Sequence, residues 1–318
     1  MDLRSPAETA VRECLALDSD ESCLVVTDDE RLAIGEALYE VASETTEDAT
    51  LMRYPPGPQH GAEPPAAVAA AMRSCDAFLA PTTKSISHTR ARSRACEAGA
   101  RGATLPGITE EVFTTGLNAD YEEIAAACES MLDAVAGAEE IRVTSPQGTD
   151  ITFEPGSRAW RDDTGLVHDT GDFSNLPAGE VFVSPETADG TYVVDGTMMP
   201  YGALEGRELK FEIEDGYVTR VSDDGVREEI EAAAAEADPD GAERNPAYNL
   251  AELGIGTNVA VTDLVGSVLL DEKAAGTVHI AIGDDAGIGG DVDAPLHLDG
   301  ILREPTVYAD GGEVELPR

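Results

Sequence analysis

Basic residues are scarce in this chain of 318 residues, with 21 lysines and arginines against 63 aspartates and glutamates. Lysine occurs only at Lys84, Lys210 and Lys273. The formal net charge of −42 disfavours nucleic acid and anionic membranes as partners, because phosphate repels a chain without a basic stripe. Strong salt makes such a charge tolerable, since it shortens the Debye length to roughly 3 Å at 1 M. We therefore expect a halophilic protein with an acidic, solvated surface, of the kind found in an acidic proteome.

Paired cysteines and long apolar runs are also missing. The five cysteines form no CxxC pair and their number is odd, which argues against a disulfide framework or a zinc ribbon. No stretch of about 18 apolar residues occurs, and the first eleven residues lack an apolar signal segment. These absences predict a cytoplasmic protein with reduced thiols and no membrane partner.

A short apolar strand followed by a helix-like pattern recurs in the first 137 residues. The expected strands begin at Cys23, Ala49, Ala77 and Ala103, and the expected helices cover residues 30–43, 66–74, 89–100 and 120–136. Alternation of this kind predicts a parallel sheet with helices on both faces.

From about residue 138 the pattern changes to period-two alternation, which is typical of half-buried strands. Asp215-Gly216 stands between two alternating runs and predicts a β-hairpin. One acidic helix is expected over residues 225–237. We therefore predict an α/β domain over residues 1–137 and a strand-rich α+β domain over residues 138–318.

Candidate metal ligands lie in the second half. His297 and Asp299 are two residues apart, so on a strand both side chains point to the same face. His279 lies inside an apolar strand, where an imidazole needs a polar partner. Glu180 and Glu252 adjoin apolar strands, and carboxylates are seldom buried unless they are paired or bound to metal.

Each of these residues also has a structural interpretation when taken alone. A histidine in a strand is more often a hydrogen-bonded core residue than a ligand, and a glutamate in so acidic a chain is usually solvated. Spacing alone therefore indicates only a possible site for divalent ions.

The residues around the candidates carry a family resemblance. Four blocks occur in order: 175–185 (NLPAGEVFVSP), 251–258 (AELGIGTN), 271–283 (DEKAAGTVHIAIG) and 297–299 (HLD). They closely resemble the thermophilic metallo-aminopeptidases, the family of aminopeptidase T and aminopeptidase S, and with this composition we identify a haloarchaeal-type member.

The resemblance implies a Rossmann-like N-terminal domain, a catalytic C-terminal domain and a homodimer. It also implies that two divalent ions, zinc, cobalt or manganese, activate a water for hydrolysis of short peptides. The implied metal ligands are Glu180, Glu252, His279, His297 and Asp299. For the proton shuttle of this hydrolase we select Glu272, which could equally be a turn acid paired with Lys273.

The sequence departs from that family after His279. Members commonly have a metal-binding tyrosine seven residues further on, where this chain has Ala286. Either a nearby acid, Asp284, Asp285 or Asp291, replaces the tyrosine, or one metal site is weakened.

Two other functions remain open. Ring-cleaving dioxygenases of dihydroxypyridines resemble the same family and hold one ferrous ion with two histidines and a carboxylate, here matched by His279, His297 and Asp299. The loss of the tyrosine suits such a one-metal site, whereas retention of both glutamates favours two metals. A binding module that kept the fold without catalysis is the third possibility.

The segment Thr82 to Arg92 gathers hydroxyl and basic side chains after a predicted strand. Open α/β sheets commonly bind ligands at this edge, but a simple cap of the following helix explains the segment equally well. No GxGxxG turn is present, which argues against a dinucleotide.

Overall fold

The computed structural model describes residues 2–237 and 244–318, and the chain divides into two compact units. The first unit consists of Met1–Ala125 and Asp163–Ala178, and the second of Ala126–Asp162 and Gly179–Arg318. The division therefore falls elsewhere than at the predicted position near residue 138. The physical reason is that Phe173–Asn175, within the segment 163–178, pair with β4 (Arg101–Pro106) of the first unit.

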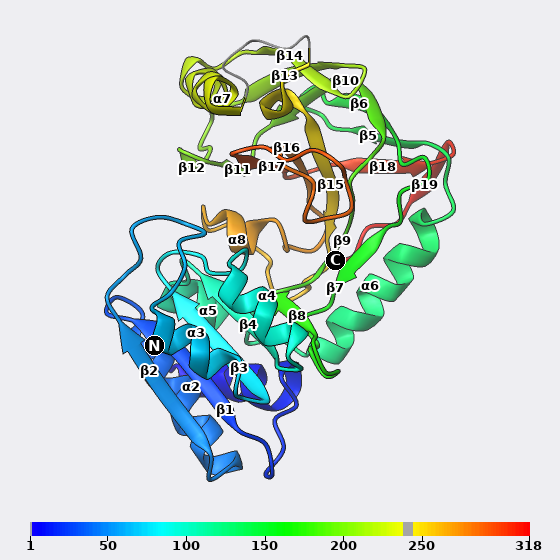
Figure 1. Cartoon of the computed structure of the whole chain (residues 1–318). Helices are drawn as coiled ribbons and strands as arrows, with labels where there is room; N and C mark the ends of the chain where they lie inside the picture. Colours follow the sequence, from blue (N-terminus) through cyan, green and yellow to red (C-terminus); the bar gives the residue numbers. More distant parts are fainter. Residues whose placement is uncertain (1, 238–243) are drawn as a thin grey trace. The chain divides into compact units, whose positions relative to one another are not determined.

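A five-stranded parallel sheet forms the centre of the first unit, in the order β2-β1-β3-β4-β8 (Figure 1). Its strands are β1 (Cys23–Asp28), β2 (Ala49–Tyr54), β3 (Ala77–Thr82), β4 (Arg101–Pro106) and β8 (Phe173–Asn175). Its helical segments are α1 (Arg4–Glu8), the π-helical turn η1 (Thr9–Cys14), α2 (Leu32–Thr45), α3 (Ala66–Met72), α4 (Arg90–Glu97) and α5 (Glu110–Gly116), and α6 (Tyr121–Val135) continues into the second unit. The predicted alternation of strands and helices is confirmed.

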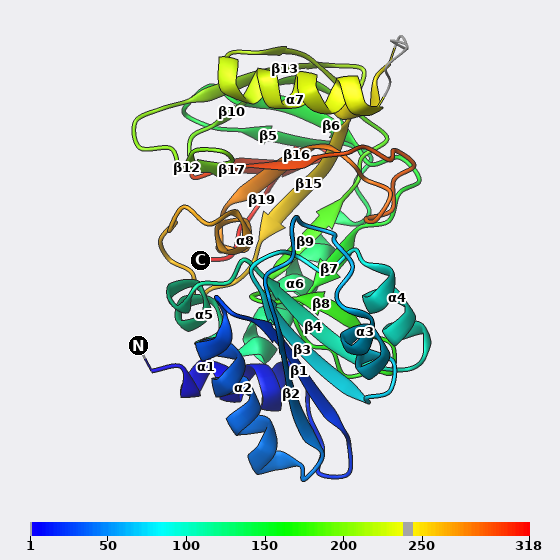
Figure 2. The same ribbon diagram turned by 60° about the vertical axis from the view of Figure 1, so that its left-hand side comes forward.

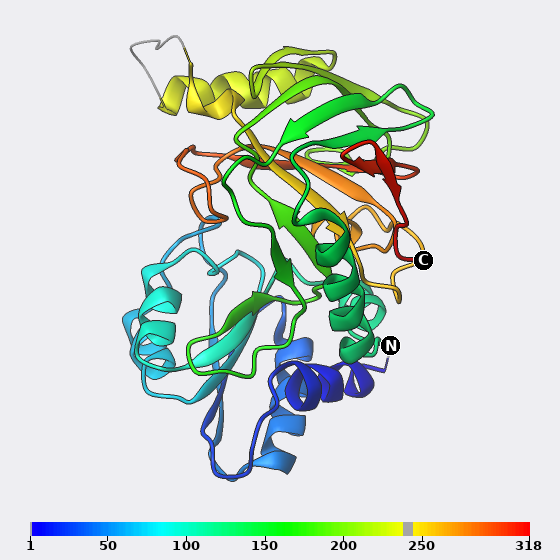
Figure 3. The same ribbon diagram turned by 90° about the vertical axis from the view of Figure 1, so that its right-hand side faces the viewer.

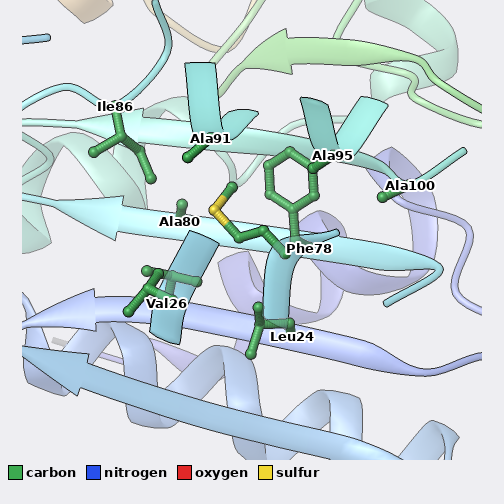
Figure 4. Packing of buried hydrophobic residues seen from close by; sticks show 10 residues of the cluster. Leu24, Val26, Phe78, Ala80, Ile86, Ala91, Ala95 and Ala100 are labelled. Carbon is green, nitrogen blue, oxygen red and sulfur yellow. The ribbon is translucent and has the colours of Figure 1, made fainter. Parts of the chain in front are cut away.

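Helices cover both faces of this sheet. Alternate residues of β1 and β3, including Leu24 and Phe78, pack against α3 and α4 in the cluster drawn in Figure 4. On the opposite face, Gly35 of α2 lies so close to Thr27 that an added Cβ would be 2.8 Å from the threonine side chain. The β1 strand is buried along its whole length, and its first four residues are apolar on both faces, as expected for a parallel sheet.

Two seven-stranded antiparallel sheets make up the second unit. One has the order β14-β13-β10-β6-β5-β18-β19 and the other β12-β11-β17-β16-β15-β9-β7. The first sheet contains β5 (Ile141–Thr144), β6 (Asp150–Glu154), β10 (Thr187–Val194), β13 (Leu209–Glu214), β14 (Tyr217–Val221), β18 (Thr306–Ala309) and β19 (Gly312–Val314). The second contains β7 (Arg161–Asp163), β9 (Glu180–Val183), β11 (Thr197–Met198), β12 (Gly202–Ala203), β15 (Leu250–Gly256), β16 (Val278–Gly283) and β17 (His297–Leu302).

The two sheets of this unit pack face to face, as the view in Figure 2 shows. Gly300 of β17 lies against Val194 of β10, and a Cβ at this glycine would be 2.5 Å from the valine Cγ2. The predicted hairpin is confirmed between β13 and β14, where Asp215 and Gly216 have φ angles of 50° and 76°. The fold class is therefore the predicted one, a parallel α/β sheet with strand-rich antiparallel sheets.

Three helical segments accompany these sheets: α7 (Asp224–Ala237), η2 (Pro246–Tyr248) and α8 (Val268–Asp271). The acidic helix α7 lies beside the β13-β14 hairpin and buries Val226 and Ile230 (Figure 3). Across the two described ranges, every helix is too short or too polar to span a lipid bilayer.

Candidate metal centre

The predicted ligands lie on four neighbouring strands, labelled in Figure 1, in the order β17-β16-β15-β9. The register of these strands places the ligands on one face of the sheet. Directly opposed residues on neighbouring strands share a face. Glu252 pairs with Ala281, which pairs in turn with Asp299. His279 pairs with Gly254, and two residues further along β15 Gly256 pairs with Glu180. The remaining ligand, His297, shares the face of Asp299 because it lies two residues before it on β17.

The side chains of the five residues form two overlapping groups. The first group is Glu180, Glu252 and His279, and the second group is Glu252, His297 and Asp299. In each group the ligand atoms all lie within 4.8 Å of one another. Glu252 belongs to both groups and therefore links them.

Glu252 lies between the two imidazoles. Its Oε1 is 3.3 Å from His279 Nε2, and its Oε2 is 3.3 Å from His297 Nε2. His279 Nε2 is also 3.3 Å from Glu180 Oε2, and His297 Nε2 is 3.4 Å from Asp299 Oδ1. The first group is buried, whereas 32% of the His297 side chain is exposed, so the second group is the one that solvent reaches.

Glycine provides the space for the His279 ring. A Cβ at Gly254 would lie 2.0 Å from His279 Nε2 and 2.1 Å from Cε1. Gly256 is equally constrained, because its Cβ would be 2.1 Å from the carbonyl oxygen of Ala274. On this one face of β15, Gly254 thus leaves room for the imidazole and Gly256 leaves room for the turn after α8.

That turn supplies two further charged side chains, Glu272 and Lys273. The Lys273 ammonium contacts Glu180 Oε1 and lies 3.0 Å from Glu272 Oε1. Only 5% of the lysine side chain and 15% of the Glu272 side chain are exposed. The sequence indicates Lys273 only as a possible partner of Glu272. The structure also places its ammonium against Glu180, a predicted metal ligand.

The pKa values of these groups depart from their usual ranges. Burial would raise the pKa of Glu252, but the hydrogen bonds with His279 and His297 outweigh it and lower the pKa. Burial would lower the pKa of His279, but the hydrogen bond with Glu252 and the Glu180 charge raise it to about 9. Burial raises the pKa of Glu272 to about 8 against the opposing charge of Lys273.

The donor set fits a divalent cation. A single ring nitrogen, His279 Nε2, lies 3.3 Å from a carboxylate oxygen of Glu180 and from one of Glu252, and it can donate a proton to only one of them. Within the described residues, His279 Nδ1 is buried without a hydrogen-bond partner. His297 Nδ1 lies 2.7 Å from the Asp284 carbonyl oxygen, an outer contact of the kind that fixes the tautomer of a ligating histidine. Imidazole nitrogen and carboxylate oxygen together suit iron, zinc and other borderline ions.

The three acids considered as substitutes for the tyrosine at Ala286 belong to neither group. Asp285 is buried and accepts hydrogen bonds from Ser184 Oγ at 2.9 Å and the Val292 amide at 2.7 Å. Asp284 contributes its carbonyl to His297, and the Asp291 side chain is 93% exposed. These acids organise the loop after β16 and do not extend the described ligand groups.

The segment from Thr82 to Arg92 forms mainly structural contacts. Thr89 caps α4 by accepting from the Arg92 amide, and Glu63 accepts from the first amides of the same helix. The Arg92 guanidinium lies over the Phe173 ring at 4.2 Å. Since Glu63 already occupies the helix terminus, the capping interpretation of this segment explains its contacts.

Two histidines and three carboxylates on one face define the donor chemistry of a metalloenzyme centre. The chain belongs to the NicX family, described as 2,5-dihydroxypyridine 5,6-dioxygenase, whose sequence model matches residues 31–315. Comparison with curated proteins gave no match.

Solved structures support the fold. The chain is similar to the 2,5-dihydroxypyridine dioxygenase of Pseudomonas putida KT2440, with a TM-score of 0.78 and 19% identity over 98% of this chain and 94% of that one. It is also similar to AmpT, aminopeptidase T, of Thermus thermophilus, with a TM-score of 0.66 and 18% identity over 98% of this chain and 99% of that one. The predicted kinship with the aminopeptidase T fold is therefore supported, while the family is that of the dioxygenase.

Proposed function

We propose that this protein is a dioxygenase that uses one ferrous ion to open the ring of a dihydroxypyridine. The match of the NicX family model over residues 31–315 carries the proposal. The convergence of His279, His297 and Asp299 on one sheet face supports it, because two histidines and one carboxylate are the usual ligands of non-haem iron oxygenases.

The three ligands would come from the two adjacent strands β16 and β17. A ferrous ion bound there would supply the activation of dioxygen and the anchoring of a ring hydroxyl. Glu252 lies between the two imidazoles and orients them. Glu272 lies 3.0 Å from Lys273 Nζ, and burial raises the pKa of its carboxyl group, so it remains our candidate for the group that exchanges a proton during the reaction.

Oxygen uptake tests this proposal directly. Protein reconstituted anaerobically with Fe²⁺ in concentrated KCl is mixed with 2,5-dihydroxypyridine, and oxygen consumption is followed together with loss of the aromatic absorbance. We expect stoichiometric consumption of both, and its loss in His297→Ala. A protein that binds iron yet consumes no oxygen with any dihydroxypyridine would refute the proposal.

A two-metal aminopeptidase is the second candidate, because Glu252 is shared between two ligand groups. A shared carboxylate is the bridge that a pair of divalent ions needs, and such a pair can activate water for peptide hydrolysis. In this function the ions are zinc, cobalt or manganese and the substrates are short peptides. Release of the chromophore from aminoacyl anilides by zinc-, cobalt- or manganese-loaded protein, without oxygen uptake, would favour this candidate over the dioxygenase.

We also propose the halophilic character and the homodimer expected from the sequence. The net charge of −42 supports the first, and the second rests on the family resemblance. Sedimentation in concentrated and dilute KCl tests both, since a protein that is folded and monomeric at every salt concentration contradicts them.

A further inference from the structure

The two ligand groups differ in their charge. In the first group, Glu180 is in contact with the Lys273 ammonium, and both side chains are buried, with 8% and 5% of their surfaces exposed. In the second group, the described residues include no lysine or arginine in ion-pair contact with Glu252 or Asp299, whose ion-pair partners there are the two histidines. The first group therefore contains the charge of a lysine before any metal binds, and the second does not.

Lys273 is fixed where it stands. Its amide donates to the Leu270 carbonyl and its carbonyl accepts from the Asn258 amide at 2.8 Å. Two residues earlier, buried Asp271 accepts hydrogen bonds from Thr197 Oγ1 at 2.5 Å and from the Gly266 amide at 2.8 Å. These bonds anchor the backbone of the turn after α8 on both sides and so hold the base of the Lys273 side chain beside Glu180.

A divalent ion in the first group would lie next to this ammonium. Like charges repel strongly in a buried site, where neither water nor salt screens them well. The lysine also occupies one of the two carboxylate oxygens of Glu180 that an ion would need. A cation in the second group meets neither obstacle.

We propose that Lys273 takes the place of a second cation beside Glu180 and thereby restricts this centre to one divalent ion, held by His297 and Asp299 with His279 as the third ligand. The inference deepens the proposed dioxygenase function and rests on it, since that function needs one ion whereas the hydrolase needs two. Lys273 is a positioning residue in this proposal: it acts on the metal through Glu180 and contacts no reacting atom.

Metal counting on the full chain tests the proposal without reference to catalysis. Purified protein is loaded with Mn²⁺ and washed with Mg²⁺ in concentrated KCl to clear the acidic surface. Bound manganese is then counted by mass spectrometry, and electron paramagnetic resonance shows whether any ions are spin-coupled. We expect one uncoupled ion per chain in the wild type.

The variants Lys273→Met and Lys273→Gln both remove the charge. The glutamine keeps a hydrogen-bond donor for Glu180, so this variant should fold even if the methionine variant does not. Both are expected to bind two ions that are spin-coupled through the shared Glu252. Lys273→Arg keeps the charge and is expected to bind one. Lys210→Met is the matched control, because Lys210 is half exposed on β13 and its removal should leave one ion.

Two results would overturn the proposal. One is a spin-coupled pair of ions in the wild type, and the other is a single ion, or two uncoupled ions, in the folded uncharged variants. Neither result is the failure of the proposed function, which is measured separately by oxygen uptake. One ion per chain without oxygen uptake would leave the role of Lys273 intact and remove the dioxygenase.

Discussion

Substitution of Gly254 by alanine is the most selective perturbation of this centre, because it adds a single carbon atom next to the His279 ring. The new Cβ would lie 2.0 Å from Nε2, whereas ordinary contacts begin at about 3.4 Å, so the ring must move by about 1.4 Å. Metal sites tolerate deviations of only about 0.2 Å in ligand distance. The displaced imidazole can therefore no longer serve as a ligand in its present position.

The expected loss is large for metal binding and small for the fold. Removal of a mere outer partner of a ligand typically weakens metal affinity by about 10- to 100-fold, so loss of the ligand itself should exceed about 100-fold. The crowding costs about 1–3 kcal/mol of unfolding free energy, and the stiffer unfolded chain offsets about 0.4–1 kcal/mol of it. Against a typical stability of about 5–15 kcal/mol, the variant should still fold.

Calorimetric titration with Fe²⁺ under argon measures the affinity, and urea unfolding of the metal-free protein measures the stability. Gly137→Ala is the control, because Gly137 belongs to the same unit and an added Cβ meets nothing within 4 Å. If Gly254→Ala binds metal within about threefold of the wild type, then His279 is not a ligand and the assignment of the centre is wrong.

Three further perturbations have defined outcomes. Asp285→Ala should lower the unfolding free energy by about 1–3 kcal/mol, because Ser184 and the Val292 amide lose their acceptor. It should also weaken metal binding, because Asp285 organises the loop that holds His297, and an unchanged metal affinity in titrations would contradict this second effect. The hydrogen bond with Arg101 lowers the pKa of Glu21. The contribution of ionised Glu21 to the unfolding free energy is therefore present above the unfolded pKa of about 4.3 and is lost as pH falls through the lower folded pKa. Glu21→Gln should therefore cost about 1–2 kcal/mol near neutral pH, because Arg101 keeps its bonds to the Leu15 and Ala16 carbonyls. It should also flatten the acid limb in urea titrations between pH 5 and 2, and an unchanged acid limb would contradict this assignment. Dilution from about 2 M to 0.1 M KCl should lower the Tm, because the Debye length grows to about 10 Å around a chain of charge −42; a Tm independent of salt in scanning calorimetry would refute the halophilic expectation.

The sequence predicted most of the elements that position the centre. Period-two alternation placed His297 and Asp299 on one face, and the structure confirms that these two side chains lie together. The hairpin at Asp215-Gly216 followed from turn chemistry alone, since few residue pairs adopt the required positive φ angles. These features are local, and local patterns are what a single sequence records.

Two features depended on distant contacts and could not be predicted. β8 contains only Phe173–Asn175, too short for any periodicity to reveal, and it pairs with β4 about 70 residues earlier in the chain. Lys273 is a polar residue beside two acids in a strongly acidic chain, so nothing in its neighbourhood indicated burial. Its role follows only from the sheet register that brings Glu180 to the same face as His279.

The late return of β8 bears on biosynthesis. Because a ribosome releases the chain from its amino end, β4 emerges with its outer edge unpaired and must wait for residues 173–175 before a neighbour can cover it. During that interval the nascent sheet exposes backbone groups that could recruit a foreign strand. A fragment ending at residue 138 would keep that exposed edge permanently, so it should aggregate. A chain extended to Ala178 contains β8, the strand that covers the edge of β4.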